Sequence, residues 1–159
     1  MKALVLNMSS ANSILEPYVG FHFLVVFELT PLLPVDYKFK EVSGLSASIT
    51  PEILIEGGEN RFKHKLPTQP DYSNLVLKRG LFKDSGLINW CRDAIENFDF
   101  NPTDMYISLL NTNHIPVANW QIVSAYPVKW SVSNFNAEEN SLVIETIELA
   151  YKYFKPINL

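Results

Sequence analysis

The sequence predicts a mainly β fold: a β-barrel-like sandwich of antiparallel strands, with one flanking α-helix at about residues 84–97 and a long extended hairpin at about residues 45–67. Three observations support this prediction. Short apolar runs rich in β-branched and aromatic residues recur between Gly, Pro and Asn turn residues. Only one segment shows the spacing of an amphipathic helix. A Gly-Gly pair between two patterned runs marks a hairpin tip.

The length and composition predict one folded domain. The 159-residue chain is 47% hydrophobic and carries a net charge of −4. We expect a single domain over residues 19–159, preceded by an irregular N-terminal arm over residues 1–18. The sequence has no block of basic residues, which disfavours both nucleic-acid binding and membrane binding by the free subunit. One cysteine excludes an intrachain disulfide, and no run is long enough for a signal peptide or a membrane span, so a soluble cytoplasmic product is expected.

Strand signals dominate the first half of the chain. The run FHFLVVFEL (21–29) predicts a strand buried on both faces, and the proline-containing TPLLPVD (30–36) predicts a loop. YKFKEVSG (37–44) predicts a second strand that ends at Gly44. SNLVLKRG (73–80) predicts a third, closed by Gly80. The hairpin lies between these last two strands.

The helix is predicted by apolar residues that recur every three or four positions. Its N-cap is Asp84 or Ser85 and its stop is Asn97, and its apolar stripe comprises Leu87, Ile88, Cys91, Ala94, Ile95 and Phe98. Four more strand signals follow. MYISLL (105–110) and PVANWQIV (116–123) are joined by the turn NTNH, and YPVKWSV (126–132) and SLVIETIELAYKYF (141–154) flank the turn NFNAEEN.

The Gly57-Gly58 pair predicts a hairpin tip rather than a phosphate-binding loop, because both flanks are strand-like and no helix follows. A two-residue turn sets residues opposite each other when their numbers sum to 115. This register places an apolar face on Leu45, Ala47, Ile49, Pro51, Ile53, Ile55, Phe62, His64 and Leu66, and a polar face on Glu52, Arg61, Lys63 and Lys65. Leu54, Glu56 and Glu59 do not fit, which leaves a four-residue EGGE tip open.

A two-stranded ribbon of this length is marginal alone in water, so its apolar face needs a cover. The cover is either the chain's own barrel or another copy of the chain, and the pattern leaves both open. Pro51 has no backbone N–H and fits a ribbon that bends out of a sheet.

Several motifs, taken in order, resemble a known family. They are FKEVSGL (39–45), EGGENRFKHKLP (56–67), NLVLKRGL (74–81), INWC (88–91), AYPVKW (125–130) and N-x-x-x-IE-x-IELAY (140–151). Together they resemble the tail-tube proteins of contractile phages and the inner-tube proteins of phage-tail-like contractile injection systems. The likeness spans about residues 20–154, which makes residues 19–159 a tail-tube-like domain.

The resemblance implies a structural function. Tube proteins of this kind form six-membered rings that stack into a hollow tube inside a contractile sheath, and their hairpin contributes to contacts between subunits and rings. The implied partners are further copies in a homo-hexameric ring, adjacent tube rings, baseplate or hub proteins, the sheath, and protein cargo or DNA in the lumen. The implied location is the bacterial cytoplasm during synthesis and then a phage tail or injection particle.

Two finer questions concern the place of the subunit in such a particle. The segments EGG…LP and AYPVKWSV resemble the subunit of the tube-initiating ring on the baseplate more than the main repeating tube subunit. The main repeating tube subunit is the alternative. The sequence does not distinguish a phage from a bacterial injection system. Roles for residues 1–18 and 30–36 stay open.

Residues able to carry chemistry are scattered. Cys91 lies on the apolar stripe of the helix and predicts a buried structural thiol. His22, His64 and His114 lack the spacing of metal ligands, so no metal site is expected. Glu138 and Glu139 predict a solvated turn.

The remaining candidates favour packing and ion pairs. Glu145 and Glu148 predict surface or interface ion pairs rather than catalytic carboxylates, and the three tryptophans predict core packing at positions 90, 120 and 130. The basic row on the ribbon faces Glu52 and Glu56, which indicates a mixed-charge surface. We therefore expect no enzymatic activity and no cofactor. The alternative of another class is a monomeric β-barrel carrier for a small ligand.

Overall fold

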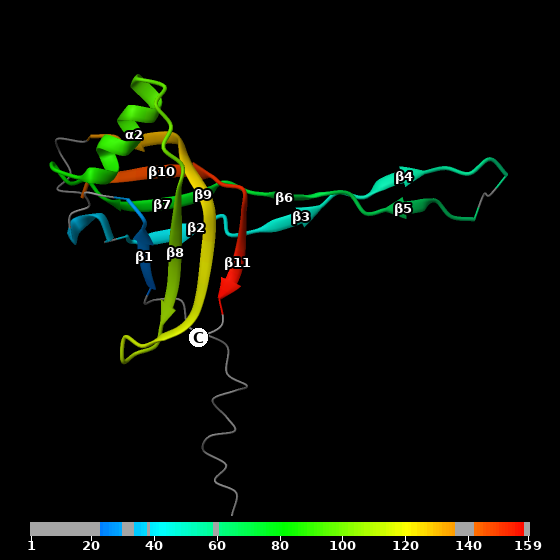
Figure 1. The fold of residues 1–159 in the computed structure, drawn as a ribbon, viewed down its shortest axis with the longest axis horizontal. Coiled ribbons are helices and arrows are strands. Elements are labelled where there is room, and N and C mark those ends of the chain that lie inside the picture. The colour runs from blue at the N-terminus through cyan, green and yellow to red at the C-terminus, as the bar shows by residue number, and fades with distance from the viewer. Residues whose placement is uncertain (1–22, 30–33, 38, 59–60, 136–141, 158–159) are drawn as a thin grey trace, which may run out of the picture.

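The computed structural model describes residues 23–29, 34–37, 39–58, 61–135 and 142–157. Within these residues the chain forms eleven strands, one α-helix and one 3₁₀-helix (Figure 1). Some of the predicted features lie outside the described residues: the N-terminal arm, the first part of the loop 30–36, His22, Glu59, Glu138 and Glu139. The elements are β1 (Phe23–Phe27), η1 (Pro34–Tyr37), β2 (Glu41–Ser43), β3 (Ala47–Ile49), β4 (Glu52–Leu54), β5 (His64–Leu66), β6 (Pro70–Tyr72), β7 (Leu75–Gly80), α2 (Gly86–Glu96), β8 (Thr103–Leu110), β9 (Pro116–Val132), β10 (Ile144–Ala150) and β11 (Tyr153–Ile157).

The body of the protein is one antiparallel sheet that is strongly bent. Its strand order is β1-β8-β9-β10-β7-β2, and β11 pairs with the first half of β9. In Figure 1, β1, β8 and β11 run steeply across the direction of β2, β7 and β10, with β9 passing from one group to the other. The described strands do not close into a barrel, since β1 and β2 end the path without pairing. The predicted mainly β fold with one helix is confirmed, in an open form.

The bend of the sheet lies in the middle of β9. Ser124 has a positive φ of 53°, and the register with β8 shifts between Thr103 and Met105. The Asp104 carboxylate accepts a 2.9 Å hydrogen bond from the Ser124 backbone N–H and so satisfies a donor at this irregular position. The sequence predicted two strands broken at 124–125, whereas the structure shows one strand with a bulge there.

The strands β10 and β11 follow the same partner without a change of direction. Leu149 lies opposite Pro127 and Tyr153 opposite Val123, so the two strands continue one register along β9. The predicted strand over residues 141–154 is therefore observed from Ile144 onward, with an interruption at Tyr151 and Lys152. Turn residues Asn111–His114 connect β8 to β9 as expected, with the Asn111 side chain accepting from the backbone of Asn113 and Ile115.

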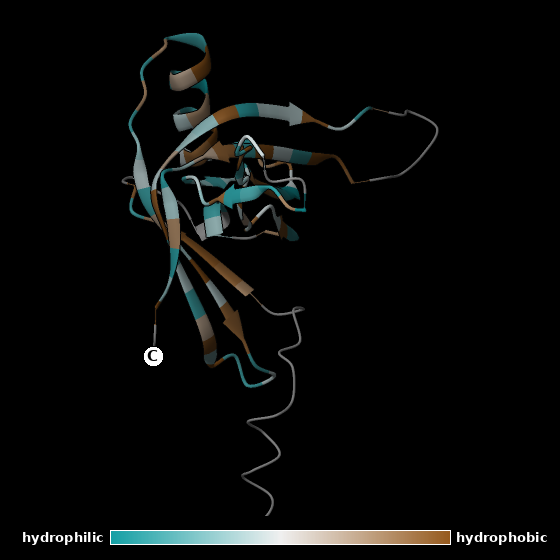
Figure 2. Ribbon diagram, turned by 90° about the vertical axis from the view of Figure 1, so that its right-hand side faces the viewer, coloured by the Kyte–Doolittle hydropathy of each residue, from teal (hydrophilic) through white to brown (hydrophobic). Residues whose placement is uncertain are grey.

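The core forms because residues alternate along each strand between a buried and an accessible face. Figure 2 shows hydrophobic and hydrophilic residues alternating along the strands of the body. The inward residues from β1, β7, β8, β9 and β10 meet α2 in one cluster: Val25, Phe27, Leu75, Leu77, Met105, Ile107, Ile122, Ala125, Ile147 and Leu149, with Leu87, Trp90 and Cys91 from the helix.

The helix agrees with its prediction at both ends. Ser85 is the N-cap, and its hydroxyl accepts a hydrogen bond from the Ile88 N–H, while Asn97 is the C-cap. The apolar stripe is narrower than the periodicity indicated, because Ile95 and Phe98 are exposed. Trp90 takes part in the buried face instead, with its indole N–H donating to the Asn101 carbonyl over 2.9 Å.

Candidate assembly ribbon

The hairpin between β2 and β7 is a two-stranded ribbon that projects away from the body (Figure 1). Its proximal part pairs β3 with β6, and its distal part pairs β4 with β5. We call residues 46–73 the ribbon. It is longer than the predicted hairpin of about 45–67, because the return strand continues through β6.

The ribbon leaves the body at a tightly packed root. Gly44 has a φ of +88°, and a Cβ there would lie 2.0 Å from the backbone oxygen of Asn74. Only glycine fits both the left-handed conformation and this close approach. Directly beyond it, the hydroxyls of Ser46 and Ser73 lie 2.6 Å apart and join the two strands.

The predicted register of the ribbon is wrong. In the distal part Ile53 lies opposite Lys65, and in the proximal part Ile49 lies opposite Pro70. These pairs sum to 118 and 119 rather than 115. Gly57 and Gly58 do lie in a turn, but pairing stops at Leu54 and His64, so the tip is longer than two residues.

The reason for the break between the two parts is a pair of prolines. Pro51 and Pro67 both lie between the paired segments, and neither can donate a backbone hydrogen bond to the partner strand. Two residues on one strand (50–51) face three on the other (67–69), which is a bulge. The Thr68 hydroxyl bridges the gap with a 2.6 Å bond to the Thr50 carbonyl.

The bulge changes which residues share a face. In the proximal part Ala47, Ile49, Pro70 and Tyr72 share one face, as in the amphipathic prediction. In the distal part the face of Ile53 also carries Lys65. We call the opposite side, with Glu52, Leu54, His64 and Leu66, the acidic face. The predicted sorting into one apolar and one polar face therefore fails beyond Pro51.

Most of the predicted ribbon residues are exposed. Leu45 and His64 are half-buried, whereas the other predicted apolar-face positions are exposed: Ala47, Ile49, Pro51, Ile53, Ile55, Gly57, Gly58, Phe62 and Leu66. The predicted polar residues Glu52, Arg61, Lys63 and Lys65 are exposed as well. Leu54, which the predicted register could not place, is also exposed.

The two parts of the ribbon differ in their cover. At the proximal end Tyr72 contacts the body, with ring centroids 5.9 Å from Tyr151 and 5.6 Å from Phe154. Within the described chain, β4 and β5 pack extensively only against each other. At the tip, the Phe62 and His64 rings lie 5.1 Å apart, and His64 Nε2 lies 3.5 Å from Glu56 Oε1.

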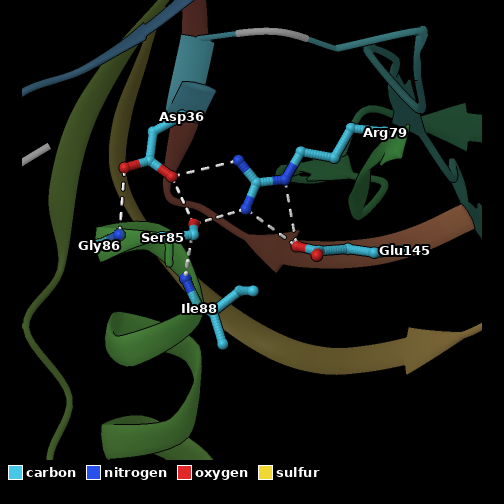
Figure 3. A network of polar contacts seen from close by, with 6 residues as sticks. All are labelled: Asp36, Arg79, Ser85, Gly86, Ile88 and Glu145. Carbon is cyan, nitrogen blue, oxygen red and sulfur yellow. Dashed lines mark hydrogen bonds and ion pairs between the residues drawn. The ribbon is translucent and has the colours of Figure 1, made fainter. Parts of the chain in front are cut away.

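A buried polar cluster holds the body behind the ribbon together (Figure 3). The Arg79 guanidinium donates to Glu145 Oε1, Asp36 Oδ1 and the Ser85 hydroxyl at 2.6–3.2 Å. Ser85 donates in turn to Asp36, and Asp36 accepts from the Gly86 N–H over 3.1 Å. The cluster links η1, β7, β10 and the start of α2.

Most of this cluster is not predicted by the sequence. Glu145 was expected in a surface or interface ion pair, but Glu145, Arg79 and Asp36 are fully or almost fully buried. Burial raises the pKa of the Glu145 carboxyl above its ordinary value, although Arg79 acts to lower it. Glu148 does form the expected accessible ion pair, with its Oε1 atom 2.7 Å from Lys129 Nζ. An arginine in an otherwise alternating strand, at an inward position, was the signal that could have identified the cluster.

The other candidate residues have structural environments. Cys91 is fully buried, and this burial raises the pKa of its thiol to about 12, as expected for a structural thiol. Trp90 is buried, while Trp120 and Trp130 are half-buried against the core.

His64 and His114 lie far apart in the fold, on β5 and in the β8–β9 turn, and the described residues contain no metal-ligating group of three or more. None of the described helices could span a membrane.

Comparisons with known proteins agree with this architecture. The family described as T4-like virus tail tube protein gp19 matches residues 19–155. A chain in the 6-fold symmetrised cryo-EM structure of the anti-feeding prophage baseplate is 32% identical, with a TM-score of 0.80 over 89% of this chain and 96% of that chain. No curated protein matches the sequence.

More distant structures share the fold. A chain of the PVC sheath–tube complex, from an extracellular contractile injection system in the extended state, is 23% identical, with a TM-score of 0.78 over 95% of this chain and 98% of that one. Hcp1 from Flavobacterium johnsoniae is 15% identical, with a TM-score of 0.54 over 84% and 93%. The chain therefore belongs to the family of the T4-like virus tail tube protein gp19, and it is a structural tail-tube protein of contractile injection systems rather than an enzyme.

Proposed function

We propose that this subunit forms a homo-hexameric ring of the inner tube and that the ribbon makes its contacts with neighbouring subunits and adjacent rings. The uncovered apolar ribbon carries this proposal. Ile53, Ile55 and Phe62 are 56%, 67% and 55% exposed in the isolated chain. Fully burying one such side chain contributes about 1.5–3 kcal/mol. Several of them together supply a large driving force for association.

The mixed charges on the ribbon support a specific contact rather than unspecific aggregation. Glu52, Arg61, Lys63 and Lys65 lie among the exposed apolar side chains. Charged groups of both signs penalise wrong registers through like-charge repulsion, so they fix how two copies meet. Sixfold symmetry is proposed because the 32% identical relative comes from a 6-fold symmetrised assembly.

Within the tube we favour the ring next to the baseplate. The support is that the relative in the baseplate structure is 32% identical, whereas the relative in the sheath–tube complex is 23% identical. Baseplate proteins, the next tube ring and the sheath are then its neighbours. The alternative is the main repeating tube subunit.

Native mass spectrometry and electron microscopy of the purified subunit test the ring. We expect masses of six subunits and ring-shaped particles with a central opening. A subunit that stays monomeric at all concentrations, alone and with partner subunits, contradicts the proposal. A monomer that retains a small molecule supports the carrier function instead.

Co-assembly distinguishes the two positions in the tube. A tube-initiating subunit forms single rings alone and nucleates long tubes when a separate main tube subunit is added. A main tube subunit polymerises into long tubes without help. Tubes of unlimited length from this chain alone would therefore contradict the baseplate position.

A further inference from the structure

The open sheet leaves a groove between its two unpaired ends. We call it the seam groove, because it lies where β1 and β2 would join in a closed barrel. Its volume is about 320 Å³, at the small end of the range for ligand pockets. Its apolar lining consists of Phe23, Val42, Leu45, Ile107, Leu109 and Trp120.

The charges at the seam groove are not balanced. Lys40 and Glu41 also line it. Glu41 is paired with Lys78, whose Nζ lies 2.9 Å from Glu41 Oε1. Lys40 is exposed and forms no ion pair with another described residue. An occupant of this groove should therefore be narrow and apolar, with an acidic group at one edge.

The acidic face of the distal ribbon has this composition. Leu54 and Leu66 are 48% and 43% exposed, and Glu52 lies beside them without an ion-pair partner in the described chain. The opposite face of the same strands carries Ile53 with Lys65. If that face entered the groove, Lys65 would meet Lys40, and like charges at close range are unfavourable.

The occupant cannot be the ribbon of the same chain. Leu45 in the groove lies directly before the ribbon, whereas Leu54 lies roughly 30 Å farther along the chain at about 3.3 Å per residue. The ribbon extends away from the body in Figure 1, and β4 and β5 pack extensively only against each other. The distal ribbon therefore reaches the groove of another copy and not its own.

We propose that the seam groove receives the acidic face of the distal ribbon of a second copy, with Glu52 of that copy near Lys40. This inference rests on the proposed self-assembly and adds the receiving site. The two surfaces differ, so the contact is head-to-tail, and it repeats from copy to copy until a ring or a stack is complete. Each ribbon then fills the open seam of its neighbour.

Disulfide crosslinking between two variants, each with one added cysteine, tests the contact. Val42→Cys places a thiol in the groove, and Leu54→Cys places one on the acidic face; native Cys91 is fully buried and stays silent. We expect crosslinked dimers when the two variants are mixed and oxidised, and none from either variant alone. Leu45→Cys replaces Val42→Cys if the latter does not fold.

The matched control is Ile53→Cys, one residue away but on the opposite face of the ribbon. Mixed with Val42→Cys, it should give at least about tenfold less crosslinked dimer, because disulfides require close and correctly directed Cβ atoms. Equal yields from Leu54→Cys and Ile53→Cys, in a protein that forms oligomers, overturn the proposed groove contact and leave self-assembly intact. A protein that forms neither oligomers nor crosslinks overturns both.

A charge exchange provides a second measurement. Lys40→Glu and Glu52→Lys should each weaken association, by up to about fivefold for an exposed ion pair. Combining both substitutions in one chain should restore it, since every contact again joins opposite charges. If the double variant associates as weakly as the product of the single effects, Lys40 and Glu52 do not meet.

Discussion

Arg79 Nη2 lies 3.1 Å from Glu145 Oε1, and the two side chains are only 1% and 0% exposed, respectively. The two residues are also direct cross-strand neighbours of β7 and β10. A buried ion pair is tolerated when further hydrogen bonds satisfy its polar atoms, and Asp36 and Ser85 supply such bonds to the Arg79 guanidinium. The Arg79 guanidinium also lies over the Phe39 and Phe82 rings, at 5.6 and 5.7 Å.

Replacing Arg79 should therefore be costly. Arg79→Met leaves two carboxylates without their cation in the core, and we expect a loss of about 3–5 kcal/mol in the free energy of unfolding. Lys129→Met is the matched control, because Lys129 and Glu148 are also cross-strand neighbours but are accessible to water. It should cost at most about 1 kcal/mol. Urea denaturation measures both, and equal losses would show that the buried cluster is not a main source of stability.

The raised pKa of Glu145 predicts a pH dependence of stability. Its ordinary value is 4.5, and burial raises the pKa in the folded protein. Above pH 4.5 the folded state thus holds this proton more firmly than the unfolded state does, and the contribution to stability falls as pH rises toward the folded pKa. Unfolding free energies measured from pH 4 upward should decline more in the wild type than in Glu145→Gln. Parallel pH profiles for the two proteins would contradict the assignment.

The sequence predicts those parts of the fold that depend on local patterns. The N-cap and C-cap of α2 follow from Ser85 and Asn97. The strands follow from alternation, since inward residues such as Leu75 and Leu77 occupy every second position. In the sequence, the bend in β9 is indicated only by the gap at 124–125 between two predicted strands, because Ser124 takes a positive φ although it is not a glycine.

The register of the ribbon could not be predicted, for a physical reason. A two-residue turn at Gly57-Gly58 makes the tightest hairpin, but the ladder hydrogen bonds that fix register are interrupted by Pro51 and Pro67. The two strands then pair in separate segments joined by a bulge. The seam groove likewise depends on the distant ends of the sheet path, β1 and β2, and no short motif encodes their separation.

The glycine at the ribbon root should be intolerant of substitution. In Gly44→Ala the new methyl group would lie 2.0 Å from the Asn74 oxygen and the residue would keep a φ of +88°, so we expect a loss above about 2 kcal/mol. Gly57→Ala is the control, because no atom lies within 4 Å of a Cβ there. Its effect should stay within about 0.5 kcal/mol. Thermal unfolding compares the two, and a neutral Gly44→Ala would mean that the root rearranges freely.

The Cys91 thiol should be inert in the folded subunit. Its pKa of about 12 leaves roughly one thiolate in ten thousand at pH 8, and the side chain is fully buried. Ellman's reagent should therefore react with the protein only as fast as it unfolds, and fully in urea. Rapid stoichiometric labelling of the native protein at pH 8 would show that α2 opens readily.

Substitutions on the ribbon should separate assembly from folding. Ile53→Asp and Phe62→Asp change side chains that are more than half exposed, so the free energy of unfolding of the subunit should shift by no more than about 0.5 kcal/mol. Ring formation, followed by sedimentation velocity, should be lost because a charge then enters the contact between copies.

Ile147→Asp is the contrasting variant, because Ile147 is fully buried between β7 and β9, and an unpaired charge there should prevent folding. Ile53→Leu and Phe62→Leu keep the ribbon apolar and should assemble normally. If Ile53→Asp unfolds the isolated subunit, the ribbon packs on its own body. If Ile53→Asp and Phe62→Asp both assemble like the wild type, neither side chain lies in a contact between copies.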